Sequence, residues 1–169
     1  MNRYFPILFL LLLGLSQSAQ AGETEIYIDA VHGEGDYALK AIEYDKLLCV
    51  AGTNLGDLQK KTTLCAHEVK AMMQHFAMSQ NLGLGSTGSI KGPEYHFQHA
   101  KVVFRAYVEQ GRKKDGTPQA MLRIQRLEGG NPPRLVKEQS IPLSSVPKNH
   151  EISFIQDLML SLLRYKKVK

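Results

Sequence analysis

The sequence predicts a single α+β domain in which helices pack on an antiparallel sheet of three to four strands. Three observations support this fold class. Apolar and polar residues alternate over much of the second half of the chain, which is typical of strands. Glycine-containing turns separate the alternating stretches. Elsewhere, apolar residues recur every three or four positions, as they do on the buried face of a helix. The expected order over residues 22–169 is β-α-α-β-β-β-α.

The first half of the chain is expected to contain one strand and two helices. Segment 25–31 is rich in β-forming residues and predicts the first strand. A helix capped by Asp36 should run to about Val50, followed by a connector over 51–56. A second helix is expected after Asp57. Its predicted core-facing stripe comprises Leu58, Thr62, Cys65, Val69, Met72 and Phe76.

The second half is expected to form a three-stranded meander and a last helix. A glycine- and serine-rich loop over 81–93 should precede a long strand over 95–110. Lys114-Asp115-Gly116-Thr117 is a hairpin signal, because Asp-Gly tolerates the positive φ that such turns need. Strands through 120–124 and 134–141 should flank a second turn over 129–133. A helix capped by Asn149 closes the predicted fold, with a broad apolar face over 152–163 that is suited to packing on a sheet.

The first 21 residues have the features of a secretory signal peptide. A basic start at Arg3 precedes an apolar run over 5–15, and Ala19-Gln20-Ala21 forms a small-x-small cleavage site. The apolar run is too short to span a bilayer, which needs about 20 apolar residues. We therefore expect cleavage after Ala21. The mature domain, 22–169, should be periplasmic or secreted, with no transmembrane segment after cleavage.

Cys49 and Cys65 are the two cysteines of the chain. In an oxidising compartment, such a pair favours one disulfide. Closing a loop of about 17 residues would stabilise the fold by roughly 3 kcal/mol. The alternative is two free, buried thiols.

The positive charge of the mature chain lies in its second half. Residues 22–99 carry 6 basic and 10 acidic side chains, whereas residues 100–169 carry 14 basic and 6 acidic ones. We expect the second half to attract acidic partners. Two basic segments form the predicted binding surface: Arg112, Lys113 and Lys114 at the hairpin turn, and Arg164, Lys166, Lys167 and Lys169 at the C-terminus. Binding to nucleic acid is disfavoured, because the chain is expected outside the cytoplasm and has no recognition motif.

Two motifs in the first half suggest ligands but have simpler interpretations. Gly83-Leu84-Gly85-Ser86-Thr87-Gly88 matches a dinucleotide-binding pattern. That pattern binds a dinucleotide only between a strand and a helix. Here a helix is expected before the motif, and the residues after it are poorly suited to begin a helix, so a loop is favoured. Asp29, His32, Glu34 and Asp36 could bind a metal ion, but their spacing matches no calcium-binding loop.

Two further sets of side chains lie in or near the second expected helix. Met72, Met73, His75 and Met78 suggest a copper site, yet Met72 and Met73 fall on the expected core stripe. Cys65 and His67 could form a thiol catalyst, which a disulfide would prevent. We predict no metal, no cofactor and no catalytic residue.

The second half resembles the amino-terminal domain of TolB-type periplasmic proteins. The resemblance covers about 70 residues: the strand 102–108, the turn 114–117, Leu122-Arg123-Ile124, the Gly129-Gly130 turn, the strand 135–141 and the helix 152–163. In that family the domain is a non-catalytic protein-interaction module of the cell envelope. The resemblance therefore implies an α+β sandwich without an active site, and it assigns no functional residue.

We predict a non-enzymatic binding protein of the bacterial envelope or the secreted fraction, which contacts a protein partner through its basic half. One alternative is peripheral binding to an anionic lipid or host membrane surface through the same basic residues. A second alternative is a secreted hydrolase whose residues meet only in the fold. A pocket that holds a carboxylate pair or a histidine–carboxylate pair would support the hydrolase.

Overall fold

The computed structural model describes residues 24–83 and 90–164. It has a mixed α+β fold, as predicted. The elements in chain order are β1 (Ile26–Ile28), α2 (Ala38–Leu58), β2 (Thr63–Cys65), α3 (Ala66–Asn81), α4 (Pro93–His99), β3 (Val102–Arg112), β4 (Pro118–Glu128), β5 (Arg134–Pro142) and α5 (Glu151–Leu163). Two short 3-10 turns, η1 (Gly35–Tyr37) and η2 (Leu143–Ser145), precede α2 and α5.

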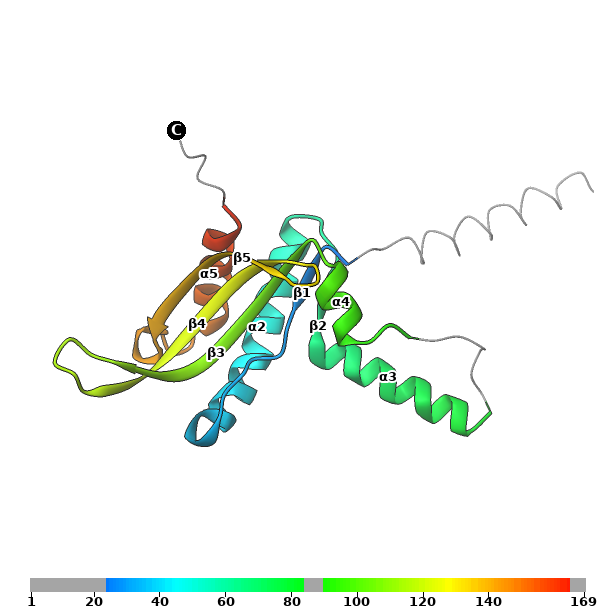
Figure 1. Ribbon diagram of the computed structural model, residues 1–169, viewed down its shortest axis with the longest axis horizontal. Coiled ribbons are helices and arrows are strands. Elements are labelled where there is room, and N and C mark those ends of the chain that lie inside the picture. Colours follow the sequence, from blue (N-terminus) through cyan, green and yellow to red (C-terminus); the bar gives the residue numbers. More distant parts are fainter. Residues whose placement is uncertain (1–23, 84–89, 165–169) are drawn as a thin grey trace, which may run out of the picture.

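The strands form one five-stranded sheet in the order β2-β1-β3-β4-β5 (Figure 1). β1 pairs in parallel with both β2 and β3, whereas β3, β4 and β5 form an antiparallel meander. The predicted antiparallel sheet of three to four strands is therefore wrong in strand number and in strand direction. Parallel pairing joins segments through crossover connections, and local alternation in the sequence does not reveal it.

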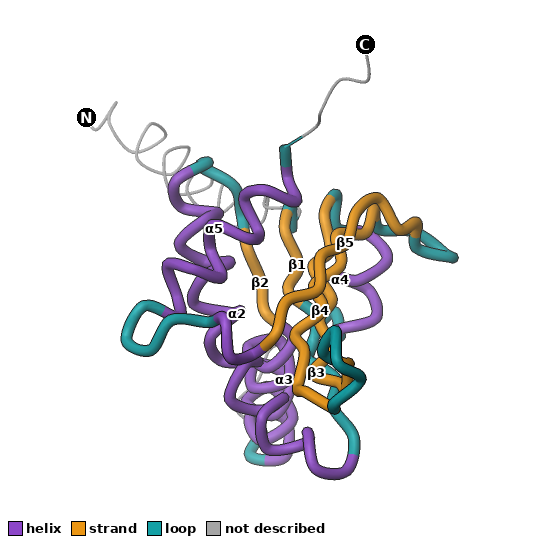
Figure 2. Tube along the Cα trace, turned by 90° about the vertical axis from the view of Figure 1, so that its left-hand side faces the viewer, coloured by secondary structure: helices purple, strands orange, loops and turns teal. Residues whose placement is uncertain are grey.

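One face of the sheet is buried under α2 and α5, which lie side by side on it (Figure 2). The main core fills this layer and includes Leu48, Phe104, Ile124, Ile155 and Met159. On the opposite face, a smaller cluster lies under α4 and the start of α3. The two faces are therefore covered unequally.

Helix α2 is longer than expected and contains the predicted connector. Gly52 and Gly56, which suggest a break, are both buried within the helix. A Cβ atom on Gly52 would lie 2.6 Å from Cδ1 of Ile28. Glycine therefore allows α2 to approach β1 closely instead of ending the helix. The predicted cap, Asp36, lies in η1, and the residue at the N-cap is Tyr37.

The predicted second helix is divided between two elements, because Thr63–Cys65 forms the edge strand β2 and α3 begins only at Ala66. Of the expected stripe, only Cys65 and Val69 are buried, while Leu58 is 73% and Met72 41% exposed. Figure 1 shows the reason: α3 projects away from the body, and little packs against its outer half. The prediction that Met72 and Met73 lie in the core is therefore wrong.

The second half matches the prediction more closely. Both hairpins form, with Arg112 paired to Pro118 and Glu128 paired to Arg134. The start of the expected long strand is instead α4, a short helix with Pro93 in its first turn. At α5 the N-cap is His150 and not Asn149, which has a φ of 65°.

Candidate functional site

The central part of the sheet has one face without a helix over it. Side chains alternate along β3, so Phe104 and Ala106 face the main core while Arg105 and Tyr107 point to the other side. The small cluster around Tyr27, Val103 and Leu127 covers only one end of that side. Beyond it, in the described part of the chain, polar and aromatic residues of β3, β4 and β5 are accessible to solvent.

Three planar side chains form a row across this open face. His32 pairs with Tyr107 through an isolated β-bridge, and Tyr107 pairs with Arg123 of β4. The His32 and Tyr107 rings are stacked with centroids 5.2 Å apart. The Arg123 guanidinium carbon lies 4.2 Å from the Tyr107 ring centroid. The row follows from cross-strand register, which places these three residues side by side.

The two arginines of the open face are held by acidic neighbours. Arg123 donates two hydrogen bonds to Glu109, of 2.7 and 3.2 Å, and these bonds raise the pKa of its guanidinium. Arg105 donates a 3.3 Å hydrogen bond to Asp29, and its guanidinium carbon lies 4.5 Å from the Phe97 ring centroid. Both guanidinium groups are therefore held in position by contacts within the chain.

These residues line a groove of about 580 Å³, which we call the sheet groove. A smaller hollow of about 230 Å³, under α4, shares Arg105 with it. The lining of the sheet groove is His32, Gly33, Glu34, Tyr37, Arg105, Tyr107, Val108, Glu109, Gln110 and Arg123. Acidic and basic side chains balance in this lining, so the positive charge of the second half is not concentrated here.

A histidine–carboxylate pair joins the sheet groove, which His32 lines, to the smaller hollow, which Asp29 lines. His32 Nε2 is 3.5 Å from Asp29 Oδ2. However, Asp29 also accepts hydrogen bonds from Arg105 and from the Ala30 amide. None of the described lining residues is a serine, threonine or cysteine that could act as a nucleophile.

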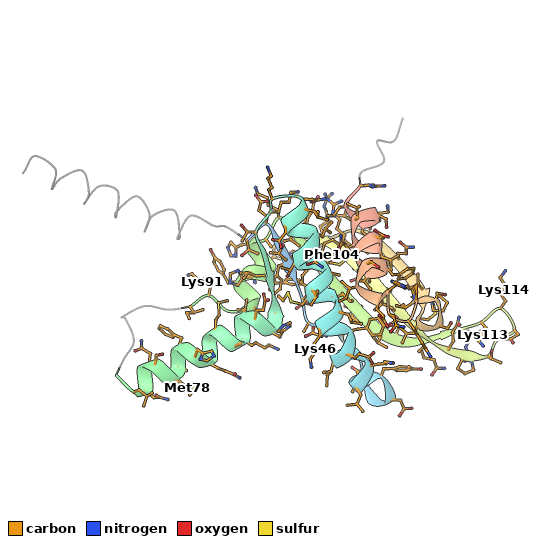
Figure 3. The ribbon with its side chains drawn as sticks, turned by 180° about the vertical axis from the view of Figure 1, so that it is seen from behind. Lys46, Met78, Lys91, Phe104, Lys113 and Lys114 are labelled. Carbon is orange, nitrogen blue, oxygen red and sulfur yellow. A yellow bond between two sulfur atoms is a disulfide. The ribbon has the colours of Figure 1, made fainter. Side chains whose placement is uncertain are left out.

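The four predicted basic residues that the structure describes lie in two separate places. Arg112, Lys113 and Lys114 lie at the tip of the β3–β4 hairpin, which extends beyond the body (Figure 3). Lys113 and Lys114 are exposed, and no acidic residue of the described chain forms an ion pair with them. Asp115 beside them accepts hydrogen bonds from the Thr117 amide and hydroxyl, which lower the pKa of its carboxyl group.

Arg164 lies far from this tip. It follows α5, whose last carbonyls at Leu162 and Leu163 accept hydrogen bonds from Arg126 of β4. Arg126 is eight residues along β4 from Pro118, which corresponds to about 26 Å of strand. Lys166, Lys167 and Lys169 lie outside the described residues.

The side chains that the sequence analysis considered as potential metal ligands are dispersed. His32 and Glu34 line the sheet groove, Asp29 lies beside His32 in the smaller hollow, and Asp36 is an exposed residue of η1. Met78 is 61% exposed at the outer end of α3 (Figure 3). Gly83-Leu84-Gly85-Ser86-Thr87-Gly88 lies almost entirely outside the described residues. Cys49 and Cys65 form a disulfide with sulfur atoms 2.11 Å apart, as the cysteine count predicted.

Sequence reasoning missed the sheet groove, although part of its signal was present. The alternation that placed Phe104 and Val108 in the core also placed Arg105, Tyr107 and Glu109 on the other face. What the alternation could not show is that this face remains uncovered, or that His32 comes to lie beside Tyr107.

No protein-family model matches the chain, and no curated protein matches it. The comparison with solved structures finds several that are similar to this chain. Two are PelC dodecamers from Paraburkholderia phytofirmans, one of them a point variant. The variant has a TM-score of 0.42 at 14% identity over 85% of this chain and 90% of that one. The other PelC structure has a TM-score of 0.36 and is 13% identical, and the match covers 84% of this chain and 86% of that chain. The third is the hypothetical protein CT253 from Chlamydia trachomatis, with a TM-score of 0.36 and 14% identity. That match covers 75% of this chain and 77% of CT253. Likeness of this degree does not indicate what the chain binds.

Within the described residues, no helix is both long and apolar enough to cross a membrane.

Proposed function

We propose that this chain is a periplasmic or secreted, non-enzymatic binding protein that engages a protein partner through the sheet groove. The observation that carries the proposal is the open row formed by His32, Tyr107 and Arg123. Tyrosine and arginine are enriched among the residues that dominate binding energy at protein interfaces. Here both are anchored by cross-strand contacts, which reduces the entropy cost of binding.

The charge of the sheet groove favours a polypeptide over an acidic lipid or glycan. Arg105 and Arg123 are each paired with a carboxylate, and Glu34 adds a further negative charge to the lining. A purely anionic ligand would have to displace Asp29 and Glu109. A polypeptide segment carries hydrogen-bond donors, acceptors and charges of both signs. It can therefore bind in the groove without breaking the two arginine–carboxylate pairs.

The test is affinity capture from native envelope extract, followed by titration of the purified partner. Tyr107→Ala removes the centre of the row, and we expect it to weaken partner binding by tenfold or more. Tyr95→Ala is the matched control, because Tyr95 is a partly exposed tyrosine on α4 outside the groove. Equal loss of binding in both variants, or no partner recovered at low salt, would contradict the proposal.

Binding to an anionic membrane surface is a second candidate, favoured by the projecting hairpin tip. Attraction to acidic lipid is worth about 1 kcal/mol for each basic residue near the surface. Arg112, Lys113 and Lys114 can approach a plane together, since the tip extends beyond the body. Charge reversal by Lys113→Glu and Lys114→Glu should abolish sedimentation with phosphatidylglycerol vesicles, and high salt should weaken it. Equal sedimentation with neutral phosphatidylcholine vesicles would count against this candidate.

The compartment can be measured directly. Fractionation of the native organism with intact-mass analysis should recover a chain that begins at Gly22, from the periplasm or the medium. The disulfide should lower its mass by two hydrogens. A cytoplasmic chain that retains its first 21 residues would contradict the proposed location.

A further inference from the structure

A cluster of potential metal ligands surrounds the disulfide, at the junction of α2, β2 and α3. One ligand atom from each of Cys49, His67 and Glu68 lies within 4.8 Å of the others. The sulfur of Cys65 is bonded to that of Cys49 and so adds a fourth potential ligand at the same place. The functions proposed above use none of these residues.

The start of α3 brings three of the four residues together. Cys65 ends β2 and is the N-cap of α3, so His67 and Glu68 lie in the first helical turn. Glu68 accepts a 3.2 Å hydrogen bond from the Cys65 amide through one oxygen. Its other oxygen lies 3.7 Å from the Cys49 sulfur, which comes from α2.

The ring of His67 is held from the side of α2. Its Nδ1 lies 3.4 Å from Asp45 Oδ2, and the other oxygen of Asp45 accepts a 2.9 Å hydrogen bond from the Val31 amide. A carboxylate beside one ring nitrogen is the usual way in which proteins orient a metal-binding histidine, and it leaves Nε2 available as a ligand.

We propose that Cys49, Cys65, His67 and Glu68 form a Zn²⁺ site that opens only when the disulfide is reduced. In the disulfide, neither sulfur is a thiolate and neither can bind the ion strongly. A dithiol reductant supplies two electrons: the S–S bond breaks, two thiols form, and the reductant becomes a disulfide. Zn²⁺ then binds two thiolates, and two protons leave to solvent.

A tetrahedral ion requires two changes: the sulfurs must separate, and the other ligand atoms must move slightly closer together. With bonds of about 2.0–2.3 Å to nitrogen, oxygen and sulfur, the ligand atoms of a zinc site lie about 3.3–3.8 Å apart. The Cys49–Glu68 distance of 3.7 Å is already in this range. The ligand atoms of Cys49, His67 and Glu68 lie within 4.8 Å of one another, so the widest pair contracts by at most about 1.5 Å. The two sulfurs are 2.11 Å apart in the disulfide, and after reduction they must move apart to about 3.8 Å. Thiolate ligands select zinc over calcium or magnesium.

Access to the site is one-sided. Cys49 is 5% and Cys65 1% exposed, whereas the side chain of His67 is 47% exposed. An ion can therefore enter past His67 and Glu68 while the two sulfurs form the buried wall. The disulfide and the metal both join α2 to the start of α3, so exchange of one for the other keeps α3 attached to the body.

The experiment uses the mature chain and adds Zn²⁺ or Co²⁺ alone, to the oxidised protein and to protein reduced without air. The reduced chain should bind one ion, and Co²⁺ should give the charge-transfer absorption of thiolate coordination. His67→Gln should weaken zinc binding at least tenfold, since it removes one ligand. His75→Gln is the matched control, because His75 is an exposed histidine further along α3. It should bind as the wild type does.

Folding is followed in parallel by near-ultraviolet circular dichroism. A native spectrum in the reduced chain, with a melting temperature that Zn²⁺ raises in wild type but not in His67→Gln, would support the site. Equal zinc binding by the oxidised chain or by His67→Gln would overturn the proposal. So would a reduced chain that unfolds and does not regain the native spectrum with Zn²⁺.

Discussion

At the scale of single residues, Gly129 shows how a turn residue can be required by its surroundings. It follows the end of β4, and a Cβ atom there would overlap the backbone carbonyl of Ala100 and lie 3.0 Å from that of Gln98. Backbone carbonyls cannot move aside as a flexible side chain can. The turn therefore depends on glycine for space, in addition to any need for conformational freedom.

We expect Gly129→Ala to lower the free energy of unfolding by about 1–3 kcal/mol, the usual range for overpacking. Gly92→Ala is the matched control, because the nearest atom to a Cβ at Gly92 is the Met73 sulfur at 3.5 Å, an ordinary contact. Chemical denaturation of both variants measures the difference. Equal stabilities would show that the chain around Ala100 can move without cost.

His96 makes the fold sensitive to acid. Its Nδ1 lies 3.2 Å from the Thr24 hydroxyl, and its ring stacks on buried Tyr27. Burial lowers the pKa of His96 from its usual 6.5. The unfolded chain therefore binds the proton more readily than the folded one. The free energy of unfolding should fall as the pH drops below about 6.5 towards the folded-state pKa.

His96→Gln should reduce this loss of stability, which is measured by chemical denaturation at several pH values between 7.5 and 5. His75→Gln, which removes an exposed histidine, controls for the loss of an imidazole. An unchanged acid dependence in His96→Gln would contradict the role given to burial of His96.

At the scale of elements, the disulfide is the covalent link between α2 and the segment that leads into α3. The two cysteines are 16 positions apart. Replacing both by alanine should lower the free energy of unfolding by roughly 3 kcal/mol, mainly because the unfolded chain gains freedom. Chemical denaturation of the oxidised wild type and of Cys49→Ala/Cys65→Ala compares the two states. A difference below about 0.5 kcal/mol would show that residual structure already restrains this segment in the unfolded chain.

The elements that sequence reasoning predicted correctly are those with local signals. The β3–β4 hairpin follows from alternation and from Gly116, which has a φ of 87°. The parallel strands could not be predicted in this way, because β1 pairs with Thr63–Cys65 only after α2 has crossed the sheet. The sequence also contains a local signal for the start of α4, because Pro93 and Glu94 suit the first turn of a helix. The sheet groove could not be predicted, since no local pattern shows which face of a sheet stays open.

At the scale of the whole molecule, stability is distributed unevenly. The main core lies between the sheet and the pair α2 and α5, and many of its side chains are completely buried. The outer part of α3 contributes little, because beyond Val69 none of its described residues is buried. The molecule therefore combines a cooperative body with a helical arm that can change its contacts at little cost in free energy.

Two methionines test this division with the same chemical change. Met159 of α5 is completely buried and lies close to Gly52 of α2, whereas Met78 of α3 is 61% exposed. Met159→Ala should lower the free energy of unfolding by about 2–5 kcal/mol, since it leaves a cavity in the main core. Met78→Ala should change it by less than about 0.5 kcal/mol. Chemical denaturation gives both values, and hydrogen exchange should show α3 amides exchanging faster than those of α2. A large effect of Met78→Ala in the isolated chain would mean that the arm packs on the body in solution.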